Sequence, residues 1–393
     1  MTAIHRRHFL KASGASLLPV LIPFGSAAAA TDTRKEATAP PDTPMVNFWA
    51  DGLMFSPVAY LAELQKANTA SAIKADSYGR GGVVAALEKK FAAITGKEKA
   101  IYLPSGTMAN QLAIALLSGD NTKIFVQDSS HVYRDEADAA QSVFQKRLMP
   151  LAKDQAFFTA EQLQNAIEGL KQEEVFTSGV GAISIENPVR RNDGAVVPIE
   201  EIKKISAYCR ANNIKMHLDG ARIYIAAAWT GTPVKEYADH FDTVYISLYK
   251  YLGAAGGAIL CGPAAVIDKI PHLIKIHGGN MYQNWPNAAM ALHRLEGIEE
   301  RFQNAISKSK ELFTELNKIA GLKINAIAGG SNIYSLTLAK EIDGKKLSDK
   351  LFETFKIGIG YPNDKNQVHL TVNETIVNQS TADIVEAFKK CMG

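Results

Sequence analysis

The chain has 393 residues, enough to bury a large hydrophobic core over two or three domains. Its formal net charge is +3, but residues 1–30 hold three basic residues and no acid, so 40 basic and 40 acidic residues remain beyond them. This balance excludes the strongly basic surface expected of a protein that binds nucleic acid or an anionic membrane. The three cysteines are too few for a disulfide framework, and we expect buried free thiols.

The first 30 residues have the pattern of an export signal. Arg6 and Arg7 precede a weakly apolar run over residues 12–24, and alanines follow at 27–30. The run is shorter than the about 20 residues of a membrane-spanning helix, and two prolines interrupt it. We therefore predict a twin-arginine signal peptide over residues 1–30 and a periplasmic mature protein without a membrane partner. A tethered membrane anchor is the alternative.

The next segments lead into the folded part of the chain. Residues 31–45 are rich in Pro, Thr and charge without apolar periodicity, which predicts a flexible N-terminus. Folding is expected to begin near Val46. Helices are predicted at residues 57–67 and 83–95, with a glycine-rich loop at 79–82 between them. Arg80 in this loop is either a solvated charge or a group that reaches a substrate or a partner subunit.

A strand-to-helix turn follows this loop. The pattern predicts a strand at residues 100–103 and a helix at 107–117, so Ser105, Gly106 and Thr107 lie where the helix begins. At that position unpaired amide groups and the helix dipole favour an anion such as a phosphate. The same residues also suit an ordinary N-cap.

Short apolar strands alternate with helices through the middle of the chain. Strands are predicted at residues 123–126, 180–185, 215–218 and 243–248, and a helix at 199–212. This alternation predicts an α/β fold with a mostly parallel sheet wrapped by helices, here a large domain over residues 46–286. Residues 287–393 are predicted to form a long linking helix at 287–319 and a small C-terminal α+β domain. Its expected elements are strands at 323–327, 332–338, 357–361 and 367–372, a helix at 345–355 and a last helix.

An aspartate and a lysine follow two of the predicted strands. Asp219 comes directly after the strand at 215–218, and Lys250 follows the strand at 243–248. Because open α/β sheets place their ligands at the carboxyl ends of strands, we expect both side chains in one site. An amine that forms a Schiff base and a carboxylate that keeps a pyridine nitrogen protonated suit pyridoxal 5′-phosphate (PLP). Taken alone, the lysine would be an exposed loop residue and the aspartate a helix cap.

Five segments carry a resemblance to a known family: residues 102–110, 130–133, 184–198, 217–224 and 245–262. In order and spacing they resemble the low-specificity threonine aldolases and aromatic amino acid β-eliminating lyases, from about Asn47 to the C-terminus. The resemblance implies PLP as the cofactor and PLP fold type I, with a mostly parallel seven-stranded sheet wrapped by helices. It also implies a homodimer or homotetramer with sites at the subunit interfaces.

The resemblance implies a role for several side chains. Lys250 is the Schiff-base lysine, Asp219 is the partner of the pyridine nitrogen, and His131 stacks on the cofactor ring near the substrate hydroxyl. A histidine satisfied within the core is the alternative for His131. Arg222 binds the substrate carboxylate or the O3′ of the cofactor. The implied phosphate contacts are Ser105, Gly106 and Thr107, with Ser247 or Lys275 in addition, and no metal ligand is expected.

The residues expected around the substrate differ from the family pattern. His369 stands where the family commonly has an arginine that pairs with the substrate carboxylate. The absence of that arginine removes a contact of about 1.5–3 kcal/mol. The substrate therefore differs, or another arginine replaces the contact. The other departures are Ala50–Asp51 in place of Ser-Asp, Pro188 to Arg191 in place of a second histidine, and Tyr249 and Tyr251 beside Lys250. The candidate substrate contacts are Arg222, Arg190 or Arg191, and His369.

These observations favour a PLP-dependent lyase of the threonine-aldolase type, which cleaves the Cα–Cβ bond of a β-hydroxy-α-amino acid to glycine and an aldehyde. The cofactor half of the site matches the family and the substrate half is altered, so β-elimination, racemisation or transamination of another amino acid is the alternative. A catalytically silent PLP-fold protein that binds an amino acid or a partner is the second alternative. The presence of both Lys250 and Asp219 argues against it.

Overall fold

The computed structural model of the protein describes residues 45–392. The predicted signal peptide at residues 1–30 and almost all of the predicted flexible segment at 31–45 lie outside the described residues. No helix within residues 45–392 combines the length and the apolar composition that a membrane span requires.

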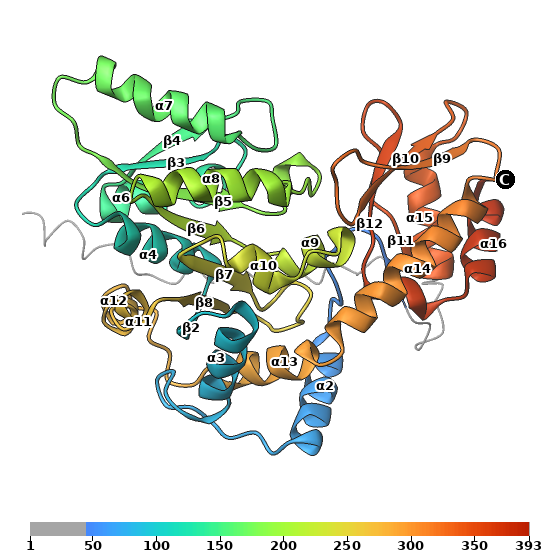
Figure 1. Ribbon diagram of the computed structural model, residues 1–393. Helices are drawn as coiled ribbons and strands as arrows, with labels where there is room; N and C mark the ends of the chain where they lie inside the picture. The colour runs from blue at the N-terminus through green and yellow to red at the C-terminus, as the bar shows by residue number, and fades with distance from the viewer. Residues whose placement is uncertain (1–44, 393) are drawn as a thin grey trace, which may run out of the picture. The chain divides into compact units, whose positions relative to one another are not determined.

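A seven-stranded sheet with the order β2-β8-β7-β6-β5-β3-β4 forms the centre of the fold (Figure 1). The strands from β7 to β4 run parallel, and β8 runs antiparallel to both of its neighbours. The predicted α/β fold with a mostly parallel seven-stranded sheet is confirmed. The strands are β2 (Lys99–Leu103), β3 (Lys123–Gln127), β4 (Arg147–Leu151), β5 (Val180–Glu186), β6 (Lys215–Asp219), β7 (Thr243–Ser247) and β8 (Ala258–Gly262).

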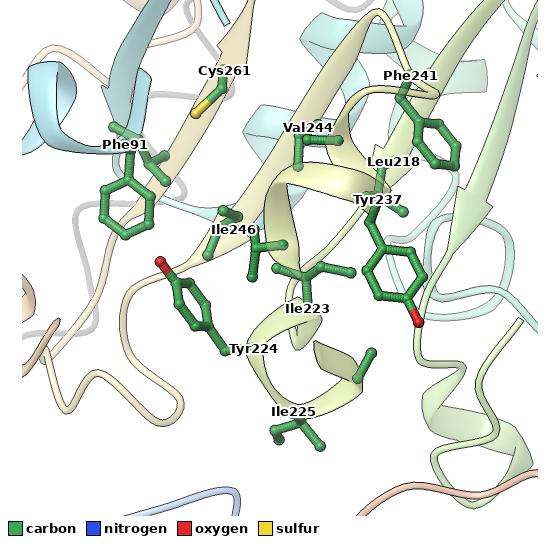
Figure 2. Close-up of a cluster of buried hydrophobic side chains, with 14 of the residues drawn as sticks. Phe91, Leu218, Ile223, Tyr224, Ile225, Tyr237, Phe241, Val244, Ile246 and Cys261 are labelled. Carbon is green, nitrogen blue, oxygen red and sulfur yellow. The ribbon is translucent and has the colours of Figure 1, made fainter. Parts of the chain in front are cut away.

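Side chains of the central strands alternate between the two faces of this sheet. On β6, Met216 and Leu218 lie on one face, and His217 and Asp219 lie on the other. The face of Met216 and Leu218 is apolar, and Figure 2 shows Leu218 in the same buried cluster as Phe91. This face is covered by α3 (Gly82–Thr95), α8 (Ile199–Ala211), α9 (Ile223–Thr230), α10 (Val234–Ala238) and α13 (Trp285–Leu295). Two further helices, α2 (Pro57–Ala70) and α7 (Ala160–Glu173), pack on α13 and α8.

The opposite face of the sheet lies under α4 (Gly106–Ser118), which contacts β5, β6, β7 and β8. Ala109, Leu112 and Ala113 of α4 share a buried cluster with Tyr245 of β7 and Leu260 of β8. Both faces are therefore buried, although the face under α4 also carries buried polar side chains, among them His217 and Asp219. Four short helices complete this side: α5 (His131–Arg134), α6 (Ala139–Phe144), α11 (Ala264–Ile267) and α12 (Ile270–Ile276).

The C-terminal elements surround a second, antiparallel sheet with the order β12-β10-β9, drawn in orange and red in Figure 1. The first described strand, β1 (Val46–Asn47), pairs with β11 (Ile357–Gly358), and Val46 and Phe48 are buried in the C-terminal core cluster. The start of the described chain is thus held by the C-terminal elements. The remaining elements are α14 (Ile298–Leu316), β9 (Leu322–Ala326), β10 (Ile333–Leu338), α15 (Gly344–Phe355), β12 (Gln367–Thr371) and α16 (Thr381–Met392).

The helical stretch predicted at residues 287–319 consists of two helices in the structure. Helix α13 ends at Leu295 and α14 begins at Ile298. Between them Gly297 has a φ of 67°, in the left-handed region that glycine adopts without a steric penalty. The apolar periodicity continues across this break, and for that reason the sequence pattern did not reveal it.

Candidate active site

The predicted functional groups gather at the carboxyl ends of the sheet strands. Asp219 ends β6 and Glu186 ends β5, while His131 follows β3 and Lys250 follows β7. Because these four strands are parallel, their carboxyl ends meet at one edge of the sheet. The sheet therefore brings together side chains that are up to 119 positions apart in the sequence, as the residue numbers of His131 and Lys250 show.

The register of the strands aligns two rows of polar side chains on the face under α4. Asp219 pairs in register with Glu186 on β5 and with Tyr245 on β7. One step earlier, His217 pairs with Thr243, and its Nδ1 lies 2.8 Å from the Thr243 Oγ1. Adjacent side chains of one row lie on the same face of the sheet. The register therefore brings these polar groups together at the bottom of the site, which we call its floor.

A pocket of about 310 Å³ opens above this floor. Its lining includes the predicted groups Asp219, His131, Lys250 and Arg222. A second hollow, of about 560 Å³, shares His131, Arg222 and Lys250 with it and extends to residues 49–54 and 331–333. The pocket is also lined by Pro104, Ser105, Gly106, Thr107, Glu136, Glu186, Ala221, Tyr245, Tyr249 and the glycine-rich segment 255–257.

The turn between β2 and α4 has the geometry of an anion site. The Ser105 Oγ accepts a hydrogen bond of 3.3 Å from the Met108 N–H, and α4 begins at Gly106. The first N–H groups of a helix have no carbonyl partner within it, so those at Gly106 and Thr107 can hold a phosphate. A Cβ at Gly106 would lie 2.0 Å from the Tyr245 hydroxyl, so only glycine allows this close approach.

Two features of its surroundings lower the pKa of Lys250. Burial, and then the Arg222 guanidinium, lower the pKa of Lys250 to about 8. A larger share of its amine is therefore neutral near pH 7 than in an exposed lysine, and the neutral amine is the nucleophile. This is the state that a lysine needs to react with an aldehyde.

Arg222 is held by a carboxylate that comes from the start of the described chain. Its Nε and Nη2 donate to the two oxygens of Asp51 at 2.8 and 2.9 Å. Both side chains are largely buried, and this bidentate geometry is among the stronger ion pairs in proteins. Asp51 therefore fixes the position of Arg222 at the boundary between the two hollows.

Two further carboxyl groups line the pocket. Glu186 accepts hydrogen bonds from the backbone N–H groups of His131 and Arg190 at 2.7 and 2.9 Å. Burial, and then the neighbouring Asp219 carboxylate, raise the pKa of Glu186 to about 7. Glu136 lies 2.9 Å from the Nδ1 of His131 through its Oε1, and this hydrogen bond raises the pKa of His131.

Several candidate residues lie outside the pocket lining. Ser247 is buried at the end of β7, and Lys275 on α12 lines a different hollow together with Arg80. Arg190 lines only the second hollow, where its Nη2 lies 3.7 Å from Asp135. Of the two remaining candidates, Arg191 also pairs with Asp135, and the Nδ1 of His369 lies 3.3 Å from the Oδ1 of Asp193.

The residues present fit PLP on three observations. The N-terminus of α4 offers amide groups to a phosphate. One oxygen of Asp219 accepts from the Ala221 N–H at 3.2 Å and the other from the Asn110 amide at 2.9 Å, so both oxygens are engaged and the carboxylate charge that would pair with a pyridine nitrogen is stabilised. Lys250 supplies an amine of lowered pKa on the same pocket.

Comparison with known proteins assigns the family. The family model described as beta-eliminating lyase matches residues 61–337. The chain belongs to the beta-eliminating lyase family. Among the relatives of this lyase, a low-specificity L-threonine aldolase of Candida albicans is 32% identical over 263 residues, which cover 66% of this chain and 69% of that protein. A low specificity L-threonine aldolase of Saccharomyces cerevisiae is 29% identical over 332 residues, which cover 83% of each chain.

Solved structures share the fold of the lyase. A putative L-allo-threonine aldolase of Listeria monocytogenes superposes with a TM-score of 0.73 at 24% identity, covering 89% of this chain and 96% of that one. The fold predicted from the sequence is thereby confirmed. The family assignment likewise confirms the predicted enzyme class, a lyase, and its PLP cofactor.

The residues of the lyase site that had no role in the sequence-based prediction include Asn110, Glu136, His217 and Tyr245. His217 and Tyr245 could have been found, because the alternation within a strand places each on the face of its neighbour two residues away. Asn110 stood within a recognised segment, but its contacts depend on where α4 crosses the sheet. No spacing signal pointed to Glu136.

Cofactor uptake is predicted to depend on pH through Lys250. The rate at which the apoprotein takes up PLP should rise with pH and level off above about 8, because the neutral amine reacts and the pKa of Lys250 is lowered to about 8. In Arg222→Gln a neighbouring positive charge is lost and Asp51 is left unpaired, so the pKa of Lys250 rises and the midpoint moves up by about one pH unit. Stopped-flow absorbance across a pH series measures the midpoint.

Arg134→Gln is the matched control, because that exposed arginine pairs with Asp128 and does not line the pocket. An unchanged midpoint in Arg222→Gln would contradict the electrostatic coupling of Arg222 to Lys250.

Proposed function

We propose that this lyase cleaves the Cα–Cβ bond of a β-hydroxy-α-amino acid, yielding glycine and an aldehyde. The observation that carries the proposal is that Lys250, Asp219 and His131 line one pocket beside an anion-binding helix terminus. The curated relatives described above are named as low-specificity L-threonine aldolases, which supports the same reaction class.

The pocket residues divide the task of holding PLP. The amide groups at the start of α4 and the Thr107 hydroxyl would hold its phosphate, Asp219 its pyridine nitrogen and Lys250 its aldehyde carbon. When bound, PLP supplies the electron sink that stabilises the negative charge left on Cα as the Cα–Cβ bond breaks. The Asp219 carboxylate would stabilise a proton on the pyridine nitrogen and so strengthen that sink.

His131 is the group that removes the proton from the β-hydroxyl. Its Nδ1 is engaged by Glu136, so the Nε2 is the ring nitrogen that can accept a proton in the pocket. A positioned base of this kind contributes about 10²- to 10⁴-fold to a rate. Arg222, fixed by Asp51, orients the substrate carboxylate.

Aldehyde release tests the proposal directly. Purified holoenzyme should release aldehyde from a panel of β-hydroxy-α-amino acids that includes L-threonine and phenylserine. Lys250→Ala should abolish both this release and the visible absorption of lysine-bound PLP, because no other amine lines the pocket among residues 45–392. His131→Gln should keep the absorption and lose about 10²- to 10⁴-fold in kcat. A coupled dehydrogenase assay measures the aldehyde.

Lys66→Ala is the control, because that exposed lysine pairs with Glu63 on α2. Visible absorption without aldehyde from any member of the panel would reject aldol cleavage. The function would then move to β-elimination, racemisation or transamination, which are tested with the same holoenzyme. A wild-type chain that takes up no PLP would leave only a silent binding protein.

We also propose that the lyase is a homo-oligomer. Four large apolar side chains stand exposed around the loop after α12, and we call them the Tyr282 patch: Tyr78, Ile276, Met281 and Tyr282. The loop lies next to the anion-binding turn, because a Cβ at Gly279 would touch the side chains of Met108 and Pro104. Exposed clusters of this kind are typical of protein interfaces. A partner copy on the patch would therefore lie beside the cofactor site.

Light scattering on the purified holoenzyme tests the oligomer. The expected mass is two or four times the 42.6 kDa of the whole chain, less the residues removed by any processing. Tyr282→Asp should shift the mass toward the monomer, because it places a charge in the buried centre of the contact. Phe176→Asp is the control, since that side chain is 92% exposed and distant in sequence from the patch. A wild-type monomer that binds PLP would contradict the proposal.

The lyase is further proposed to reach the periplasm by twin-arginine export. Arg6 and Arg7 before the apolar run support this pathway, which carries folded proteins and so permits PLP to be bound before export. Cell fractionation of the full chain should find the activity in the periplasm. Replacing both Arg6 and Arg7 by Lys should retain it in the cytoplasm, whereas the control Arg34→Lys should not. Equal distribution of the two variants would contradict the pathway.

A further inference from the structure

A buried chain of hydrogen bonds runs beneath the candidate active site. The Asn110 Nδ2 lies 2.9 Å from an oxygen of Asp219 and 2.7 Å from the Oε1 of Glu136. The same Glu136 oxygen lies 2.9 Å from the Nδ1 of His131. On its other side, the Asn110 Oδ1 lies 2.9 Å from the Nε2 of His217. The carboxamide of Asn110 thus connects the partner of the pyridine nitrogen to the group that holds His131.

The donor and the acceptor of the hydrogen bonds around Asn110 follow from the protonation of His217 and from the two carboxylates. Burial lowers the pKa of His217 to about 4, so its ring is neutral and carries one proton. The amide nitrogen of Asn110 must face the two carboxylates, because the opposite orientation would place its oxygen against both. Its oxygen then accepts from the Nε2–H of His217, and the Nδ1 of His217 accepts from the Thr243 hydroxyl. Both hydrogens of the Asn110 amide are used, one for each carboxylate.

Glu136 is fixed in place by these contacts. Only 5% of the residue is exposed, and its Oε1 receives both the Asn110 amide and the His131 ring. Its Oε2 is buried and finds no hydrogen-bond partner among residues 45–392. The carboxylate therefore cannot turn to serve another group without losing both contacts.

The charges around His131 come from several elements. Glu136 and Asp135 follow it in the chain, Asp219 lies on β6 and Glu186 on β5. The cations of the pocket, Arg222 and Lys250, line the same space. Among the acids only Glu136 makes a hydrogen bond to the imidazole ring, whereas Glu186 accepts from the backbone N–H of His131.

We propose that Glu136 is a positioning residue for the reaction at His131. Its Oε1 accepts the Nδ1–H of His131, which fixes the ring and its tautomer and leaves the Nε2 lone pair as the acceptor for the substrate proton. As that proton arrives, the Glu136 charge stabilises the imidazolium that forms. Asn110 keeps the carboxylate in this orientation. The role of His131 as the base rests on the proposed lyase function.

Glu136→Gln tests the proposal by removing the charge and keeping the shape. The glutamine oxygen can still accept from His131 and Asn110, and its amide takes the position of the unpaired Oε2. With the negative charge lost, the pKa of His131 should fall by about one unit or more. NMR titration of histidine-labelled full-length protein, with and without PLP, measures this pKa, and His131→Gln assigns the resonance among the nine histidines.

The pH profile supplies a second readout. A base must be deprotonated to act, so kcat/KM for aldehyde release rises as the pH passes the pKa of His131. In Glu136→Gln this acid limb should move to lower pH with the pKa of His131, and kcat should fall about 10- to 100-fold, the same order as for the loss of a carboxylate that orients a metal-bound histidine. KM should change less than kcat, because the hydrogen bonds of Glu136 go to His131 and Asn110.

Two further variants separate this role from a structural one. Glu136→Asp keeps the charge but moves it, so kcat should fall while the acid limb stays near its wild-type position. Glu88→Gln changes a partly buried carboxyl, whose pKa is raised to about 7 and which accepts from the Tyr102 N–H, and it should leave both His131 and the profile unchanged. An unshifted His131 titration in Glu136→Gln would overturn the proposal, and so would an equal shift in Glu88→Gln.

The proposal can still be tested if Glu136→Gln does not fold or if the wild-type holoenzyme releases no aldehyde. If Glu136→Gln does not fold, Glu136→Asp decides, because wild-type kcat in that variant would show that the position of the carboxylate is irrelevant and overturn the proposal. If the wild-type holoenzyme releases no aldehyde, the proposed function fails, but the NMR titration still shows whether Glu136 controls the protonation of His131.

Discussion

The register of the three central parallel strands is the constraint on which the site depends. It places Glu186, Asp219 and Tyr245 in one row across β5, β6 and β7, and His217 beside Thr243 one step below. Because side chains alternate along a strand, a slip of one residue would send Asp219 into the apolar face. The apolar packing of the opposite face, by α3, α8, α9 and α10, therefore holds the catalytic groups in position as well as stabilising the fold.

Burial of these side chains also shifts the pKa values of two groups in the pocket. It raises the pKa of Glu186 to about 7 and is the first cause of the lowering of the Lys250 pKa to about 8, so both pKa values move toward neutral pH. Groups with such values can change protonation at small cost during a reaction. The backbone N–H groups of His131 and Arg190 donate to Glu186 and hold its carboxylate in place.

The sequence predicted those parts of the site that depend on local patterns. Asp219 and Lys250 were found because each follows an apolar run, and the turn at Ser105 because a helix begins there. Contacts between distant segments were not predictable in the same way. The pairing of Arg222 with Asp51 joins residues 171 positions apart, and the engagement of His369 by Asp193 requires the C-terminal sheet to reach the loop after β5. Strand β8 was missed because its apolar run continues a glycine-rich stretch.

The pairing of Arg222 with Asp51 suits Arg222 to the proposed role of the arginine that is absent at position 369. The guanidinium uses its Nε and Nη2 for Asp51, which occupies one edge of the fork. Three N–H groups remain, and two of them, on Nη1 and Nη2, form the end of the fork that can bind a second carboxylate bidentately. Asp51 thus orients Arg222 and leaves enough guanidinium N–H groups to bind a second carboxylate. His369 lines neither hollow, whereas Arg222 lines both of them together with Lys250. Under the proposed function, the carboxylate contact would therefore be relocated to Arg222 rather than lost.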